Sequence, residues 1–289
     1  MDGMASPPPA GWMLLGALAF AVFLLCLVAL TAGILRLCLA PPGYPELKDR
    51  LQRRALEPGT LVRLVAILAG LNGLLVAGAR LAFRGDPAAY EASQGWILAA
   101  QTLTFHGAGL ALVCWAAGRN GERIGFRLGW NHRWVRAIGA GLWSYLALLP
   151  LVLGAGIAWR AALQAWGHEM APQSFLEVMA GNPHAGLKVY LVFAGIALAP
   201  VAEELLFRGV LLPFLSPRIG LTASVLSTAL LFAALHFNAA AFLPIFLLGL
   251  GLGALYALTG HILAPVTLHA LFNGVNLALL MHLPPGASS

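Results

Sequence analysis

The sequence predicts an all-α, polytopic bundle of about eight transmembrane helices. Of its 289 residues 60% are hydrophobic and only 10% are charged, whereas a soluble domain carries about 25% charged residues. The apolar residues form long runs and do not alternate with polar residues, as the strands of a membrane barrel would. Because backbone groups in lipid must find their hydrogen bonds within the chain, such runs are expected to be helices.

Eight apolar runs can be drawn, most of them near the roughly 20 residues that one membrane span requires. The sixth is short, and the last three lie close together. Clusters of proline and glycine separate several of the runs, as turns between helices do. The expected segments are Trp12–Leu39, Leu61–Phe83, Trp96–Ala117, Trp134–Trp159, Leu187–Leu212, Leu221–Leu235, Ala239–Leu258 and Ile262–Leu280.

The charged residues indicate how the chain lies in the membrane. Arginine and lysine are concentrated in the loops after the first and third runs, so the odd-numbered loops are expected to be cytoplasmic and both termini outside. We expect a multi-pass protein of the cell (inner or plasma) membrane, with the lipid bilayer as a partner. The net charge of +6 follows from these loops, and nucleic acid is not an expected partner because no basic face carries interleaved aromatic residues.

The chemistry-bearing residues lie in the C-terminal third, which divides the chain into an N-terminal four-helix transmembrane region, 1–186, and a catalytic transmembrane core, 187–289. In the fifth run Glu203 and Glu204 precede Arg208. Glu204 and Arg208 are four residues apart and share a helix face, so they can pair. Glu203 is rotated by about 100° from Glu204, which leaves one carboxylate held by a cation and one available for chemistry.

Two further runs carry histidines. His236 ends the sixth run, one turn after Phe232. His269 and Asn273 are four residues apart on the eighth run, with Asn276 one turn further, so all three are expected to face one cavity. Polar side chains in a membrane helix are costly and usually face the protein interior.

Together these side chains have the composition of a hydrolytic site. A carboxylate can take a proton from water, and an imidazole can orient that water or protonate a leaving group. Alternatively, Glu203, His236 and His269 make three zinc ligands with one open position. Asn273 is a candidate donor to the negative charge that develops on a carbonyl oxygen. The sequence leaves zinc and a metal-free glutamate mechanism equally open.

These motifs resemble those of the CAAX protease and bacteriocin-processing family of membrane proteases, also called CPBP or Abi. That family shows Glu-Glu-x-x-x-Arg, Phe-x-x-x-His and His-x-x-x-Asn on successive apolar helices, and all three patterns are present here, over about Leu187–Leu280. The resemblance implies that Glu203 activates water with the support of Glu204 and Arg208. It implies that His236 and His269 complete the site, that Asn273 stabilises the oxyanion, and that eukaryotic relatives remove the last three residues of prenylated CAAX proteins.

We therefore predict an intramembrane endopeptidase that acts on a peptide or lipidated protein in the membrane. The alternatives are a non-catalytic membrane scaffold or bacteriocin-immunity protein of the same fold, and a transporter with a buried proton relay. For His236 to meet Glu203, either the fifth helix continues past Arg208 towards Leu215, or the sixth starts deep in the membrane or is tilted; we expect the first. His106, in the third run, is interpreted as a packing residue.

Overall fold

The computed structural model describes residues 18, 20–25, 28, 44–119, 133–168, 178–179, 181 and 184–282. Within these ranges the regular structure is helical and contains no strand, which confirms the predicted all-α fold. The expected first span, Trp12–Leu39, lies mostly outside the described residues. The other seven expected runs each coincide with a helix, and most of their ends agree within a few residues. The exceptions are the third run of the chain, whose helix begins earlier at Pro87, and the fourth and fifth runs, whose helices end later at Ala165 and Ile219.

Five helical stretches in the described part are long and apolar enough to cross a membrane. They are Pro58–Ala82, Pro87–Trp115, Trp134–Ala165, Ala185–Ile219 and Ala239–Thr259. Two further apolar helices are shorter, Leu221–Ala234 and Leu263–Leu279. A multi-pass membrane protein is therefore confirmed, while the count of eight spans stays a prediction.

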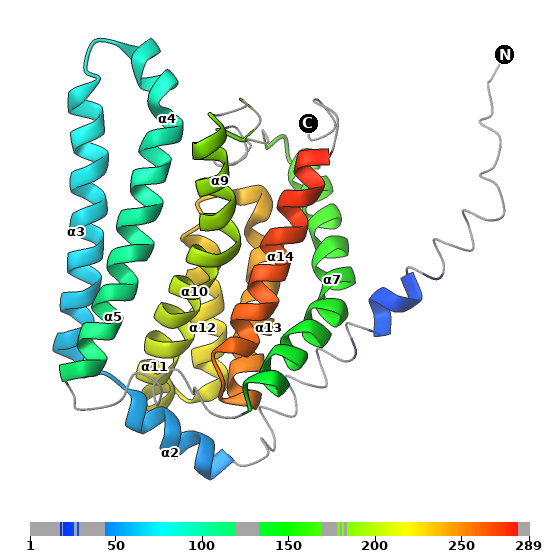
Figure 1. Ribbon diagram of the computed structural model, residues 1–289. Coiled ribbons are helices and arrows are strands. Elements are labelled where there is room, and N and C mark those ends of the chain that lie inside the picture. Colours follow the sequence, from blue (N-terminus) through cyan, green and yellow to red (C-terminus); the bar gives the residue numbers. More distant parts are fainter. Residues whose placement is uncertain are drawn as a thin grey trace, which may run out of the picture.

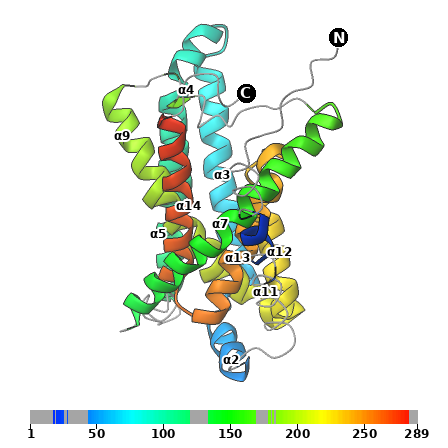
Figure 2. The same ribbon diagram turned by 90° about the vertical axis from the view of Figure 1, so that its right-hand side faces the viewer.

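The helices form a core bundle with a helical pair beside it (Figure 1). The pair is α3 (Pro58–Ala82) and the stretch made of α4 (Pro87–Thr102), the π-helical turn η1 (Leu103–Gly107) and α5 (Ala108–Arg119). The core contains α7 (Trp134–Ala165), α12 (Leu221–Ala234), α13 (Ala239–Thr259) and α14 (Leu263–His282). Helix α7 runs obliquely across α13 and α14 (Figure 2).

A short helix, α2 (Tyr44–Arg54), lies across the end of the bundle where α11 ends (Figure 1). The sequence analysis treated this segment as a loop, because its charged residues hide a short amphipathic pattern. Leu51 is 1% exposed and packs into the core, and the buried Arg54 donates a 2.6 Å hydrogen bond to the hydroxyl of Tyr256 in α13.

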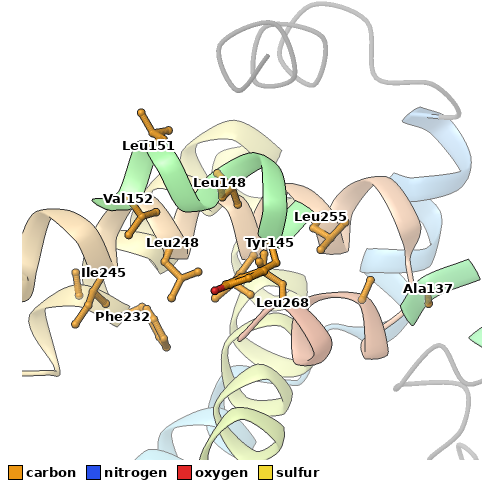
Figure 3. Packing of buried hydrophobic residues seen from close by; sticks show 13 residues of the cluster. Ala137, Tyr145, Leu148, Leu151, Val152, Phe232, Ile245, Leu248, Leu255 and Leu268 are labelled. Atoms are coloured by element: carbon orange, nitrogen blue, oxygen red, sulfur yellow. The ribbon is translucent and has the colours of Figure 1, made fainter. Parts of the chain in front are cut away.

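Apolar side chains of α7, α13 and α14 form the main core, which includes Phe232 of α12 (Figure 3). Small residues on α13 let the neighbouring helices approach closely. A Cβ at Gly249 would lie 3.1 Å from Ala229, and a Cβ at Gly251 would overlap Leu148 of α7. This close packing fixes α12 and α13 against each other, and thereby the depth at which His236 lies.

Candidate active site

The two adjacent carboxylates lie on one continuous helical stretch, Ala185–Ile219. It consists of α9 (Ala185–Phe193), η2 (Ala194–Leu198), α10 (Ala199–Glu204), η3 (Leu205–Leu211) and α11 (Leu212–Ile219), where η2 and η3 are π-helical. Pro200 lies two residues after the end of η2, and Pro213 lies two residues after the end of η3. A proline inside a helix lacks an N–H and clashes with the carbonyl four residues earlier, and a π-helical turn absorbs that mismatch.

The extension of this helix settles the depth of the site. The helix continues past Arg208 to Ile219, as predicted, so Glu203 lies near the middle of a 35-residue helix. Helix α12 has 14 residues and is thus about 21 Å long, shorter than the hydrocarbon core of about 30 Å. His236, which follows α12, therefore lies at membrane depth beside the same bundle.

Glu204 and Arg208 form a buried ion pair, as their spacing predicted. Both side chains are 0% exposed, and Nη1 of Arg208 donates a 2.8 Å hydrogen bond to Oε1 of Glu204. Nη2 of Arg208 donates to the backbone carbonyl of Gly249 at 2.9 Å, and the guanidinium lies 4.9 Å from the ring centre of Phe232. His269 contacts the same carboxylate oxygen through Nδ1 at 2.9 Å. Oε1 of Glu204 therefore holds both Arg208 and His269, while its Oε2 is buried with no hydrogen-bond partner among the described residues.

Glu203 faces a different set of partners. Its Oε1 lies 3.2 Å from Nε2 of His106, and its Oε2 lies 3.7 Å from Nε2 of His269. The second distance is too long for a direct hydrogen bond, and Oε2 is buried with no hydrogen-bond partner among the described residues. His106, His236 and His269 all lie close enough to interact electrostatically with this carboxylate.

His236 lies at the exposed edge of this group. Its Nδ1 is 2.7 Å from the carbonyl oxygen of Phe232. The Phe232 ring contacts both histidines, with its centre 4.9 Å from the ring of His236 and 5.6 Å from that of His269. The aromatic ring thus fixes how the two imidazoles lie relative to each other.

The three histidines share one hydrogen-bonding pattern. In each ring Nδ1 contacts an oxygen, from the backbone of Thr102, the backbone of Phe232 or the carboxylate of Glu204. A carbonyl oxygen and an ionised carboxylate accept only, so each Nδ1 carries a hydrogen and donates it. Nε2 is left for the other side of the ring, and in His106 and His269 that atom faces Glu203. Such an arrangement fixes the tautomer of a neutral imidazole in His236 and His269, whereas both ring nitrogens of His106 face acceptors when Glu203 is ionised.

The proposed zinc ligands were tested against this geometry. Among the described residues no three or more His, Cys, Asp or Glu side chains are arranged to hold a metal ion. Oε2 of Glu203 lies 3.7 Å from Nε2 of His269, and His236 contacts the backbone and the ring of Phe232. No zinc site is formed among the described residues, zinc or metal-free catalysis stays a prediction, and the steps below are assigned to side chains alone.

Asn273 and Asn276 differ in where they point. Nδ2 of Asn273 donates a 2.9 Å hydrogen bond to the carbonyl of Gly195 in the π-helical segment η2. This ties α14 to the glutamate helix and leaves the second amide hydrogen for another acceptor. Asn276 is exposed, so the expectation that it faces the same cavity is wrong. Seven positions turn a helix by only about 20°, so Asn276 is separated from His269 mainly by about 10 Å along the axis of α14.

His106 is the site residue that the sequence analysis missed. It was interpreted as packing, but it is buried and its ring bridges the third span to Glu203. One signal was present, since a histidine within an apolar span pays a high cost unless it has a polar partner. Its partner lies 97 residues away, and no local pattern gives that separation.

These features define a class of protein: a helical membrane protein with a carboxylate and several imidazoles buried between its helices. Residues 185–275 match the family model described as Type II CAAX prenyl endopeptidase Rce1-like. This segment is similar to that family, and the match confirms the resemblance seen in the motifs. The matched segment includes Glu203, His236 and His269, whereas His106 lies outside it. No curated protein and no solved structure matches the chain.

Proposed function

We propose that this protein is an intramembrane endopeptidase of the CAAX prenyl protease type, in which Glu203 activates the attacking water. The observation that carries the proposal is the contrast between the two carboxylates. Glu204 is paired with the guanidinium of Arg208 and is 0% exposed, while the ion-pair contacts of Glu203 in the described part of the chain are to imidazoles and its side chain is 17% exposed. The family match over residues 185–275 supports proteolysis as the class of reaction.

The proposed reaction begins with a water molecule held between Oε2 of Glu203 and Nε2 of His269. Oε2 accepts a proton from this water while the water oxygen attacks the carbonyl carbon of the scissile peptide bond. The tetrahedral intermediate then collapses, the C–N bond breaks, and the proton on Glu203 moves to the departing amine. Each proton is accounted for by Glu203, so the cycle needs no further reactant.

Two side chains are proposed to assist at the substrate carbonyl. The developing negative charge on its oxygen needs positioned donors. The amide of Asn273 has one N–H left after its bond to Gly195, and His236 at the exposed edge of the site can donate from Nε2 when protonated. Glu204 and Arg208 hold His269 by its Nδ1 and thereby orient Nε2 towards the water.

The substrate is proposed to be a peptide or lipidated protein that reaches the site within the bilayer. Glu203 lies midway along its membrane span, and exposed apolar residues cover the helices around it. A substrate with an attached isoprenoid can partition into the same depth.

The test is cleavage of a farnesylated peptide ending in a CAAX sequence by purified protein in liposomes. Glu203→Gln keeps the shape of the side chain and removes its basicity, and His269→Ala removes the second contact to water. Removing a general base typically lowers the rate by about 10²–10⁴-fold. Glu91→Gln, the same chemical change at an exposed position of α4, is the matched control and is expected to cleave at the wild-type rate. A cleavage rate for Glu203→Gln equal to that of the wild type would overturn the proposal.

A further inference from the structure

His106 lies in a part of the chain that the family match does not cover. It belongs to the helical pair beside the core and contacts Glu203 from there. It occupies the fourth position of the π-helical turn η1. Its Nδ1 lies 3.0 Å from the carbonyl oxygen of Thr102, and its Nε2 lies 3.2 Å from Oε1 of Glu203. The side chain is 11% exposed, so water competes little for either bond.

The wide turn explains why the ring reaches Glu203. π-helical turns occur mostly as single insertions at functional sites, and this one follows α4 without a proline to demand it. The turn is braced by Tyr190, on the same continuous helix as Glu203. The hydroxyl of Tyr190 donates to the carbonyl of Ala99 at 3.1 Å and lies 3.0 Å from Oγ1 of Thr102. The two spans are therefore joined twice, through Tyr190 and through the pair His106–Glu203.

The hydrogen bonds of His106 leave it one way to act. Nδ1 must donate to Thr102, because a carbonyl oxygen only accepts. A carboxylate oxygen also only accepts, so Nε2 donates to Oε1 of the ionised Glu203 in the imidazolium form of the ring, and this bond leaves the other oxygen, Oε2, directed towards His269. A glutamate side chain has three rotatable bonds, and fixing one of its two oxygens selects a single orientation of the carboxylate.

We infer that His106 is a positioning residue, which holds Oε1 of Glu203 so that Oε2 faces the attacking water. The inference rests on the proposed function for its kinetic consequence, although the hydrogen bond itself does not. It assigns a function to the N-terminal helical pair: the pair supplies a side chain that orients the glutamate of the C-terminal core.

The test compares two substitutions that separate the two nitrogens of the ring. The amide nitrogen of glutamine can take the place of Nε2, so His106→Gln keeps a donor to Glu203. The amide of asparagine takes the place of Nδ1, so His106→Asn keeps only the bond to Thr102. His168→Asn, at an exposed position after α7, is the matched control.

We expect His106→Asn to lower kcat for the farnesylated CAAX peptide by about tenfold to a hundredfold, the range for losing one hydrogen bond to a charged group. KM is expected to change by less than about threefold, because a hydrogen bond to Glu203 acts on the reaction rather than on peptide binding. His106→Gln should recover most of the lost kcat. A wild-type kcat in His106→Asn would overturn the inference, and so would equal losses in both variants, because a hydrogen bond from Nε2 predicts that they differ.

A second measurement does not depend on cleavage. Infrared difference spectra, with Glu203→Gln identifying the carboxylate band of Glu203, are expected to show a shifted band in His106→Asn and a wild-type band in His106→Gln. If the wild type cleaves no faster than Glu203→Gln, the proposed function fails, and the infrared result alone decides the inference. An unshifted band in His106→Asn would then overturn it, while a shifted band confined to that variant would support it.

Discussion

Replacing Arg208 by methionine removes the cation that compensates the buried carboxylate of Glu204. Arg208 and Glu204 are both 0% exposed and share a 2.8 Å hydrogen bond, and Arg208 also donates to the carbonyl of Gly249 in α13. Breaking a buried ion pair by removing one partner costs about 3–5 kcal/mol, because the other charge stays buried. We expect Arg208→Met to lower the unfolding temperature in detergent by about 6–20 °C, at roughly 2–4 °C per kcal/mol for a chain of this size.

The double variant Glu204→Gln/Arg208→Met tests the cause of that loss. A neutral glutamine removes the buried negative charge, and its carbonyl oxygen can still accept from Nδ1 of His269. Replacing both partners of a buried pair is often close to neutral for stability, so the double variant should be more stable than Arg208→Met alone. The double-mutant cycle is expected to give a coupling free energy of at least about 2 kcal/mol.

Thermal unfolding of purified protein, followed by intrinsic fluorescence, provides the measurement. Arg84→Met is the control, because Arg84 is exposed and an exposed arginine contributes little. An unfolding temperature for Arg208→Met within about 2 °C of wild type, less than the shift expected for 1 kcal/mol, would refute the argument. The argument would also be contradicted if the double variant lost more free energy of unfolding than the two single variants lose when their losses are added.

Three further predictions concern packing, charge and metal. Gly251→Ala is expected to destabilise the fold by about 1–3 kcal/mol through overlap with Leu148, as judged by the unfolding temperature; Gly73→Ala, where nothing lies within 4 Å, should be neutral or slightly stabilising, and equal effects of the two would count against the packing argument. Burial and the neighbouring Arg54 lower the pKa of Arg50, so its charged form is less favourable in the folded than in the unfolded state at every pH below that pKa. Arg50→Gln should therefore raise the unfolding temperature at pH 7 relative to the exposed-site control Arg53→Gln. A lower unfolding temperature for Arg50→Gln would contradict this sign. Elemental analysis of purified active protein should find well under one zinc per chain, with cleavage unaffected by a chelator; one zinc per chain that is lost together with activity would instead assign the metal role to the site.

The fold was largely predictable because lipid imposes one strong rule on the backbone. Long apolar runs must be helical in a bilayer, and α3, α7 and α13 follow that rule. Helix α2 did not, since it lies at the end of the bundle and its burial depends on Leu51 meeting α11 and α13. The π-helical segments were also beyond sequence reasoning, although Pro200 and Pro213 mark places where an α-helix has to adjust.

The candidate site was predictable where one helix face determines it. The spacing of Glu204 and Arg208 predicts their pairing, and the structure confirms it. The contacts between helices could not be read from spacing. The sequence does not say that His269 contacts Glu204 as well as Glu203, or that His106 contacts Glu203, because these depend on how helices far apart in the chain cross.

Single-turnover cleavage in ¹⁸O-labelled water measures the central claim most directly, namely that Glu203 activates a water molecule for peptide hydrolysis. The wild type in liposomes is expected to release a farnesylated peptide fragment whose new carboxylate carries one ¹⁸O atom. Glu203→Gln is expected to release it at least about 10²-fold more slowly, while Glu91→Gln matches the wild type. Labelled product formed at the wild-type rate by Glu203→Gln would contradict the account.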